Sequence, residues 1–202
     1  MRYVWIAFTA AVLSLASLTA FANSPNSVIE EAVELLTEGL DGRKAELAAD
    51  RPALYRLIDS ILLPRFDREF AARVVLAKHW KTASTEQRDR FIEAFYQSLM
   101  RRYADGALEF DPSMITILPF RGDATKNRTK VRSTVVLDDG SKVAVDYDLV
   151  KRESGWLVFN VAIEGVSYVI NYRAELDSEI SSSSLDAVID RLEIEAGISA
   201  NE

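Results

Sequence analysis

The first half of the chain repeats apolar side chains every three or four positions, which is the spacing of amphipathic helices. A first helix is predicted to begin at Ser27, which forms a capping box with Glu30. A second is predicted to open at Asp50 and to end at Pro64, with one stripe of Leu and Ile side chains between them.

Two more helices are predicted in this half. Asp67 is placed to cap the third, which carries Trp80 near its end. Ser84 and Gln87 form a second capping box, which opens the longest helix. Large side chains recur every four residues along it, at Phe91, Phe95, Leu99 and Tyr103. This periodicity is compatible both with a filled core and with the wall of an apolar pocket.

The second half of the chain shows the patterns of antiparallel strands. Strands are predicted over 114–118, 130–137 and 142–151, with a last, interrupted strand region over 155–173. Asp138-Asp139-Gly140-Ser141 predicts a hairpin, since Asp-Gly accepts the left-handed dihedrals of tight turns. A short helix follows the run of serines over 181–184. Helices followed by strands predict a single α+β domain over residues 23–202, with helices packed on one face of the sheet.

The last strand region carries large apolar residues at both parities of its pleat. Trp156 and Val158 share one side, and Leu157 and Phe159 share the other, so we expect cover on both faces. Gly165 interrupts the region, and a residue without a side chain suits a bend or a bulge. The antiparallel sheet is therefore expected to be strongly curved.

The N-terminus has the pattern of an export signal over residues 1–22. Arg2 precedes an apolar run from Val4 to Leu18, and Ala20-Phe21-Ala22 predicts cleavage after Ala22. The run is shorter than the roughly 20 apolar residues that a membrane span needs. The mature chain is therefore predicted to be soluble and exported.

The composition excludes some classes of function. The chain contains no Cys, so about 180 mature residues must be held together by core burial without disulfides. The net charge of -7 argues against a general binder of nucleic acid or anionic membrane, both of which attract excess Lys and Arg.

The usual signatures of catalysis are missing from the sequence. It has no Gly-rich phosphate loop, no nucleophile elbow and no Cys nucleophile. His79 is the single histidine, so no His-based metal cluster can form, and a structural or surface role is expected for it.

Two charged patterns lie in the predicted strands. Asp146 and Asp148 share a face opposite Tyr147, which suits acid–base chemistry if one is desolvated, or a simple solvated face. Four basic residues also share one parity and suit either phosphate contact or a strand edge that blocks aggregation: Lys126, Arg128, Lys130 and Arg132.

A set of motifs, together with the export signal, gives a family resemblance. In chain order they are Trp80-x-x-Ala83-Ser84-x-Glu86-Gln87-x-x-x-Phe91, Tyr103, Val145-Asp146-Tyr147, Gly155-Trp156, Glu164-Gly165-Val166-Ser167 and Asn171-Tyr172-Arg173. Together they resemble the MlaC family, also called toluene-tolerance proteins, over most of the mature chain. Asn160 and Leu176 depart from the family pattern, which commonly has Asp and an aromatic residue there. The first departure removes a charge next to the Gly165 bend.

The resemblance implies a phospholipid carrier of the periplasm rather than an enzyme, and it implies no cofactor. Family members enclose acyl chains in an apolar cavity between helices and a curved sheet, and leave the head group in solvent. They move diacyl phospholipid between an outer-membrane lipoprotein–porin complex and an inner-membrane ATP-driven transporter, which maintains outer-membrane lipid asymmetry.

On this basis we predict the apolar residues that line the cavity. They are Phe91, Phe95, Leu99, Tyr103, Val145, Tyr147, Leu149, Phe159, Val161, Val166 and Tyr168.

Two other interpretations stay open on the sequence. One is a cone-shaped α+β enzyme, isomerase-like, in which Asp146 is the base in an apolar pocket. The other is a periplasmic chaperone or adaptor that binds apolar peptide segments.

Overall fold

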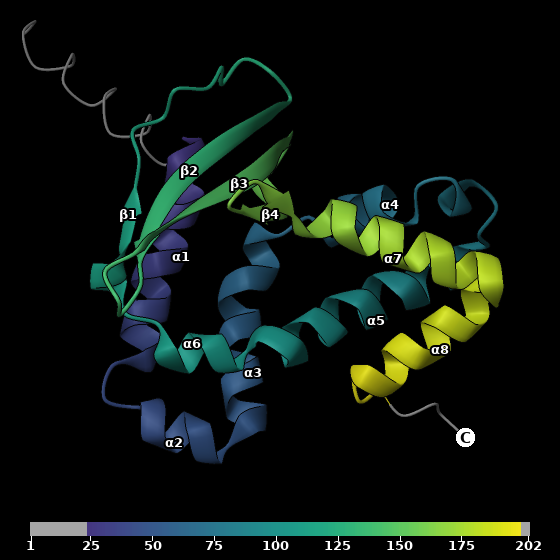
Figure 1. Ribbon diagram of the computed structural model, residues 1–202, viewed down its shortest axis with the longest axis horizontal. Helices are drawn as coiled ribbons and strands as arrows, with labels where there is room; N and C mark the ends of the chain where they lie inside the picture. The colour runs from purple at the N-terminus through teal and green to yellow at the C-terminus, as the bar shows by residue number, and fades with distance from the viewer. Residues whose placement is uncertain (1–23, 199–202) are drawn as a thin grey trace, which may run out of the picture.

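The computed structural model describes residues 24–198 (Figure 1). The predicted signal peptide lies outside the described residues. In chain order the elements are α1 (Pro25–Leu40), α2 (Lys44–Ala49), α3 (Arg51–Leu62), α4 (Arg68–Leu76), α5 (Thr85–Tyr103), α6 (Asp105–Glu109), β1 (Ile115–Ile117), β2 (Arg128–Val136), β3 (Lys142–Arg152), β4 (Gly155–Ile163), β5 (Val166–Ser167), α7 (Tyr168–Ser182) and α8 (Leu185–Glu195). This is a single α+β domain, as predicted.

The strands form one antiparallel meander in the order β1-β2-β3-β4-β5. A bulge lies between β3 and β4, where Asp148 pairs with Asn160 but Leu149 pairs with Val158, which leaves Phe159 as the extra residue. A bulge bends a strand and increases its twist. The sheet is correspondingly twisted in Figure 1.

The predicted bend at Gly165 is a two-residue hairpin turn. Glu164 and Gly165 have φ values of 49° and 79°, and Ile163 pairs with Val166 on either side of them. Positive φ at both central residues is the geometry of the turn that suits the twist of paired strands. The Asp-Gly hairpin is also confirmed, with Gly140 at φ 79° between β2 and β3.

Two predicted helix boundaries were wrong. The first helix begins at Pro25 rather than Ser27, because Ser24 caps it and proline is favoured in the first turn. The helix capped by Asp67 ends at Leu76, where Ala77 takes φ 47°, so Trp80 lies in a separate 3-10 turn.

The prediction of strand for residues 168–173 was also wrong. Only Val166 and Ser167 pair with β4, and α7 begins at Tyr168. Ser167 caps this helix by accepting a hydrogen bond from the backbone N–H of Ile170 at 3.2 Å. Helical spacing then buries Val169 and Leu176 together.

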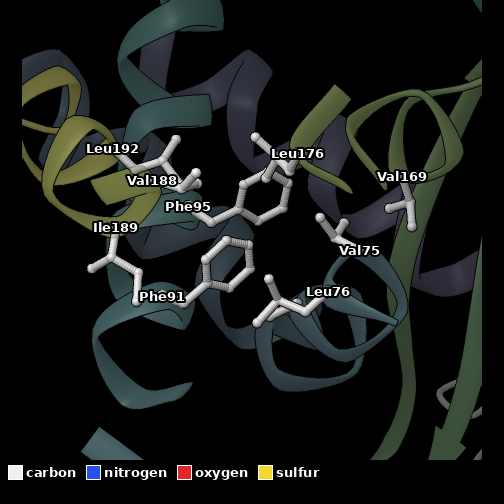
Figure 2. Packing of buried hydrophobic residues seen from close by; sticks show 11 residues of the cluster. Val75, Leu76, Phe91, Phe95, Val169, Leu176, Val188, Ile189 and Leu192 are labelled. Carbon is white, nitrogen blue, oxygen red and sulfur yellow. The ribbon is translucent and has the colours of Figure 1, made fainter. Parts of the chain in front are cut away.

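Most of the buried hydrophobic side chains of the described chain fall into three clusters. One, which we call the helical core, joins α4, α5, α7 and α8 and is shown in Figure 2. The second lies among α1, α2, α3 and α5, around Leu54, Ile58 and Tyr96. The third, the sheet core, packs Ile29 of α1 against Val131, Leu149, Trp156 and Val158. Within residues 24–198, no helix is both long and apolar enough to cross a membrane.

Candidate functional site

The structure places two predicted residues inside the helical core. Phe91 is fully buried and Phe95 is 3% exposed, and their rings stack with centroids 5.4 Å apart. Figure 2 shows both rings among Leu76, Leu176 and Ile189. Leu99 packs against the same cluster and is partly buried. Phe91 and Phe95 therefore occupy a packed core.

A second group of predicted residues lies on the sheet face that α1 covers. Tyr147 pairs with Val131 on one side and Val161 on the other, and all three join the sheet core together with Leu149. Paired residues of neighbouring strands project from the same face. Burial raises the pKa of Tyr147, which keeps its hydroxyl neutral on this apolar face.

The same face continues beyond the cover of α1. Val145 pairs with Ile163, and Ile163 pairs with Val166 across the hairpin turn. These three residues, which we call the apolar sheet end, lie outside the three clusters formed by residues 24–198. Val145 is 8% exposed, whereas Val166 is 52% exposed. The apolar face of the sheet thus runs from the core to the surface.

A ladder of aromatic side chains runs from the helical core to the first residue of α7. Tyr172 packs edge-on against Phe95 with centroids 5.3 Å apart, and its hydroxyl lies 3.2 Å from that of Tyr103. Tyr103 in turn packs edge-on against Tyr168 at 5.6 Å. Tyr168 is the first residue of α7 and lies two positions after Val166 of the apolar sheet end. Tyr103 is 47% exposed.

Sequence reasoning did not place Tyr172 in the site. Tyr172 was assigned to the last predicted strand region, and that assignment predicts no contact between Tyr172 and Tyr103. Tyr168 and Tyr172 are four residues apart, so a helical assignment puts both rings on one face of α7.

Phe159 lies apart from the other predicted residues. It is the extra residue of the bulge, and its ring packs edge-on against Phe70 of α4 with centroids 4.8 Å apart. The bulge therefore turns Phe159 toward α4.

The other face of β2 and β3 carries a cluster of ion-paired side chains. Lys130 Nζ lies 2.8 Å from Asp146 and 3.6 Å from Asp148, and its hydrogen bond to Asp146 raises the pKa of Lys130. Asn160 donates to Asp148 at 2.7 Å. The isomerase-like interpretation requires Asp146 to be a desolvated base. Asp146 is instead ion-paired with Lys130.

The four basic residues that share one parity in the sequence have different surroundings in the structure. Lys126 precedes β2, Lys130 is paired as described, and Arg128 lies over the Phe70 ring at 5.9 Å. Arg132 is exposed on the same face. These residues do not form one continuous row of free cations.

His79 links two helical segments. Its Nε2 lies 2.6 Å from Oδ1 of Asp177 on α7, and Lys78 Nζ lies 2.7 Å from the same oxygen. Hydrogen bonds from Lys78 and His79 lower the pKa of Asp177.

Two of the hollows on the described surface lie away from the predicted lipid-contact residues. One of about 480 Å³ lies between the end of α1, α2 and residues 110–112. The other, of about 200 Å³, lies beside Ser27, Arg65 and Trp156. Neither is lined by any of the predicted lipid-contact residues.

Comparisons with known proteins identify relatives of this chain. A family model described as MlaC protein matches residues 30–194. The chain is 28% identical over 176 residues to a toluene tolerance protein of Pseudomonas putida, covering 86% of this chain and 81% of the relative. It is 23% identical over 195 residues to the intermembrane phospholipid transport system binding protein MlaC of Haemophilus influenzae, covering 94% and 91%.

The fold also matches a solved structure. A phospholipid-binding protein from Ralstonia solanacearum, solved in complex with a phospholipid, superposes with a TM-score of 0.75 at 23% identity, covering 85% of this chain and 96% of that one. The family model spans every helix and strand from within α1 to within α8. The chain therefore belongs to the MlaC protein family.

Proposed function

We propose that this protein is a periplasmic phospholipid carrier that encloses acyl chains and moves lipid between the two membranes of the envelope. The observation that carries the proposal is the family match over residues 30–194. The relative named for intermembrane phospholipid transport and the neighbour solved with a phospholipid support it.

We place the acyl chains against the apolar sheet end and the neighbouring face of β3 and β4. Val145, Tyr147 and Val161 offer an apolar surface that continues to the exposed Val166. We assign Tyr103 and Tyr168, whose rings pack edge-on against each other, to its outer limit. Phe91 and Phe95 then have a supporting role. They form the packed core against which Tyr172 is held, and Tyr172 in turn positions Tyr103.

Hydrophobic energetics favour a carrier over free diffusion of the lipid. Each methylene removed from water is worth about 0.8 kcal/mol, so two chains with roughly fourteen buried methylenes each represent on the order of 20 kcal/mol. Transfer from a bilayer to an apolar site is close to neutral by comparison, because both environments exclude water. Loading and unloading are then balanced, and the partners set the direction.

We assign those partners as an outer-membrane lipoprotein–porin complex and an inner-membrane ATP-driven transporter. The negative charge of the chain supports release from anionic lipid surfaces, because like charges repel. If the carrier does not stay on lipid surfaces, delivery of the lipid depends on docking to these partner proteins.

Lipid transfer between vesicles tests the proposal. Donor vesicles with a fluorescent phospholipid and unlabelled acceptor vesicles are held apart by a membrane that passes the protein alone. We expect label to reach the acceptors only when the protein is present. Equal transfer of label with the protein and in a blank without it would contradict the proposal that the protein carries phospholipid.

A further inference from the structure

Four polar-tipped side chains meet where α5 ends and α7 begins. The guanidinium of Arg102 donates from Nη1 to the Tyr172 hydroxyl at 3.2 Å, and the Tyr103 hydroxyl lies 3.2 Å from the same oxygen. Tyr168 packs against the Tyr103 ring. Arg102 and Tyr103 are adjacent in sequence, but the last turn of α5 directs both toward Tyr172.

This cluster has more hydrogen-bond donors than acceptors. Arg102 carries five N–H groups and no acceptor, and the nearby carboxylate that the described chain supplies is Glu195, 3.8 Å from Nη2. The contact between the two hydroxyls uses one of their protons, so the other hydroxyl has a proton to donate elsewhere. Burial, and then the hydrogen bond with Tyr103, raise the pKa of Tyr172 to about 12, so its hydroxyl is protonated at neutral pH.

The donors face solvent beside an apolar surface. The Arg102 side chain is 50% exposed, and Val166, which lies two residues before Tyr168 in the sequence, is 52% exposed. A ligand that satisfies both regions is anionic at one point and apolar next to it. The linkage between the head group and the acyl chains of a phospholipid has this character.

We propose that Arg102, with the hydroxyls of Tyr103 and Tyr172, binds the phosphate group of the carried phospholipid. This assignment rests on the proposed function and names its polar contact. A guanidinium matches phosphate oxygens with paired N–H donors. Since every phospholipid has this phosphate, the contact selects phospholipids over uncharged diacyl lipids and tolerates different head groups.

The neighbouring Arg101 provides a matched control. Its guanidinium lies over the Tyr55 ring at 5.4 Å, against α3 rather than α7. Arg101→Gln and Arg102→Gln remove the same charge from adjacent positions. Tyr172→Phe keeps the ring that packs on Phe95 and removes only the hydroxyl.

The experiment is a competition for the lipid-free protein. Wild type and the three variants are incubated with vesicles that contain equal amounts of phosphatidylglycerol and diacylglycerol with identical chains. Native mass spectrometry then gives the ratio of the two complexes. We expect wild type and Arg101→Gln to favour the phospholipid by about tenfold or more, as for a charge-assisted hydrogen bond. Arg102→Gln is expected to lose most of that preference while its total bound lipid is retained, and Tyr172→Phe to lose part of it.

An Arg102→Gln protein that keeps the wild-type ratio would overturn the assignment. Loss of preference in Arg101→Gln to the same degree would overturn it as well, because general charge then suffices. If wild type bound neither lipid, the proposed function itself would fail, which is a separate result. Inorganic phosphate is expected not to displace the lipid. Displacement at millimolar phosphate would contradict the proposal, because the cluster would then be a site for free anions.

Discussion

Asn160 of β4 donates a hydrogen bond from Nδ2 to Oδ2 of Asp148 on β3, at 2.7 Å. Its own Oδ1 accepts from the Ser167 hydroxyl at 3.0 Å and from the backbone N–H of Val169 at 3.1 Å. Asn160 is 5% exposed. One buried amide, with both a donor and an acceptor, thus joins two strands to the first turn of α7.

Asn160→Asp is expected to destabilise the fold at neutral pH by about 2 kcal/mol, because a carboxylate cannot donate and meets the charge of Asp148. Two adjacent carboxylates raise the pKa of one of them in the folded state. The folded protein then binds more protons than the unfolded chain, so the deficit shrinks as the pH falls toward that raised pKa. Urea unfolding at pH 7 and pH 5 measures both effects.

The exchanged pair provides the control. Asn160→Asp combined with Asp148→Asn restores one donor and one acceptor, and we expect it to recover most of the lost stability. A double variant no more stable than Asn160→Asp would show that the contact between the two side chains is not the cause.

Gly165→Ala tests the hairpin turn that directs the chain into α7. A Cβ at this position meets no atom within 4 Å, so the cost comes only from φ 79° and is expected to be about 1 kcal/mol. Asn tolerates this region better than Ala, so Gly165→Asn should cost less. Thermal unfolding of the two variants gives the comparison, and equal stability of Gly165→Ala and wild type would refute strain at the turn.

Val145→Asp tests the proposed lipid surface. A charge on this buried position of the apolar sheet end is costly next to an acyl chain, so lipid co-purified with the folded variant should be lost. Ala144→Asp is the control, since Ala144 is exposed on the polar face one residue away. Circular dichroism establishes folding, and mass spectrometry gives lipid content. Unchanged lipid in a folded Val145→Asp protein would remove Val145 from the site.

Tyr172 gives a prediction at alkaline pH. Its pKa of about 12, against an ordinary value of 10.0, means that folding disfavours the tyrosinate. Its contribution to stability is therefore complete below about pH 10 and is lost as the pH rises toward 12. The difference in unfolding free energy between wild type and Tyr172→Phe should change across this interval, and a constant difference would contradict the raised pKa.

The elements with local signals were predictable from the sequence. The Ser84–Gln87 capping box opens α5, Asp67 caps α4 and Asp-Gly turns β2 into β3. Each depends on contacts between residues at most four positions apart. The antiparallel strands and the fold class followed from these signals and from the alternation of apolar residues.

The elements set by distant contacts were not predictable. Tyr168, Val169 and Ile170 have high strand propensity, yet they form the first turn of α7, because Asn160 and Ser167 satisfy its N–H groups and the helical core accepts Val169. The same holds for the site. Phe91 and Phe95 are predicted to line a cavity, and the structure adds that they pack in one cluster with Ile189 of α8, almost 100 residues away in the sequence.

The mass of protein purified from the periplasm without detergent tests the central claim most directly. Native mass spectrometry is expected to show the mature chain with the added mass of a diacyl phospholipid, in several head-group forms. Protein that carries no lipid, or a bound peptide in its place, would contradict a phospholipid carrier.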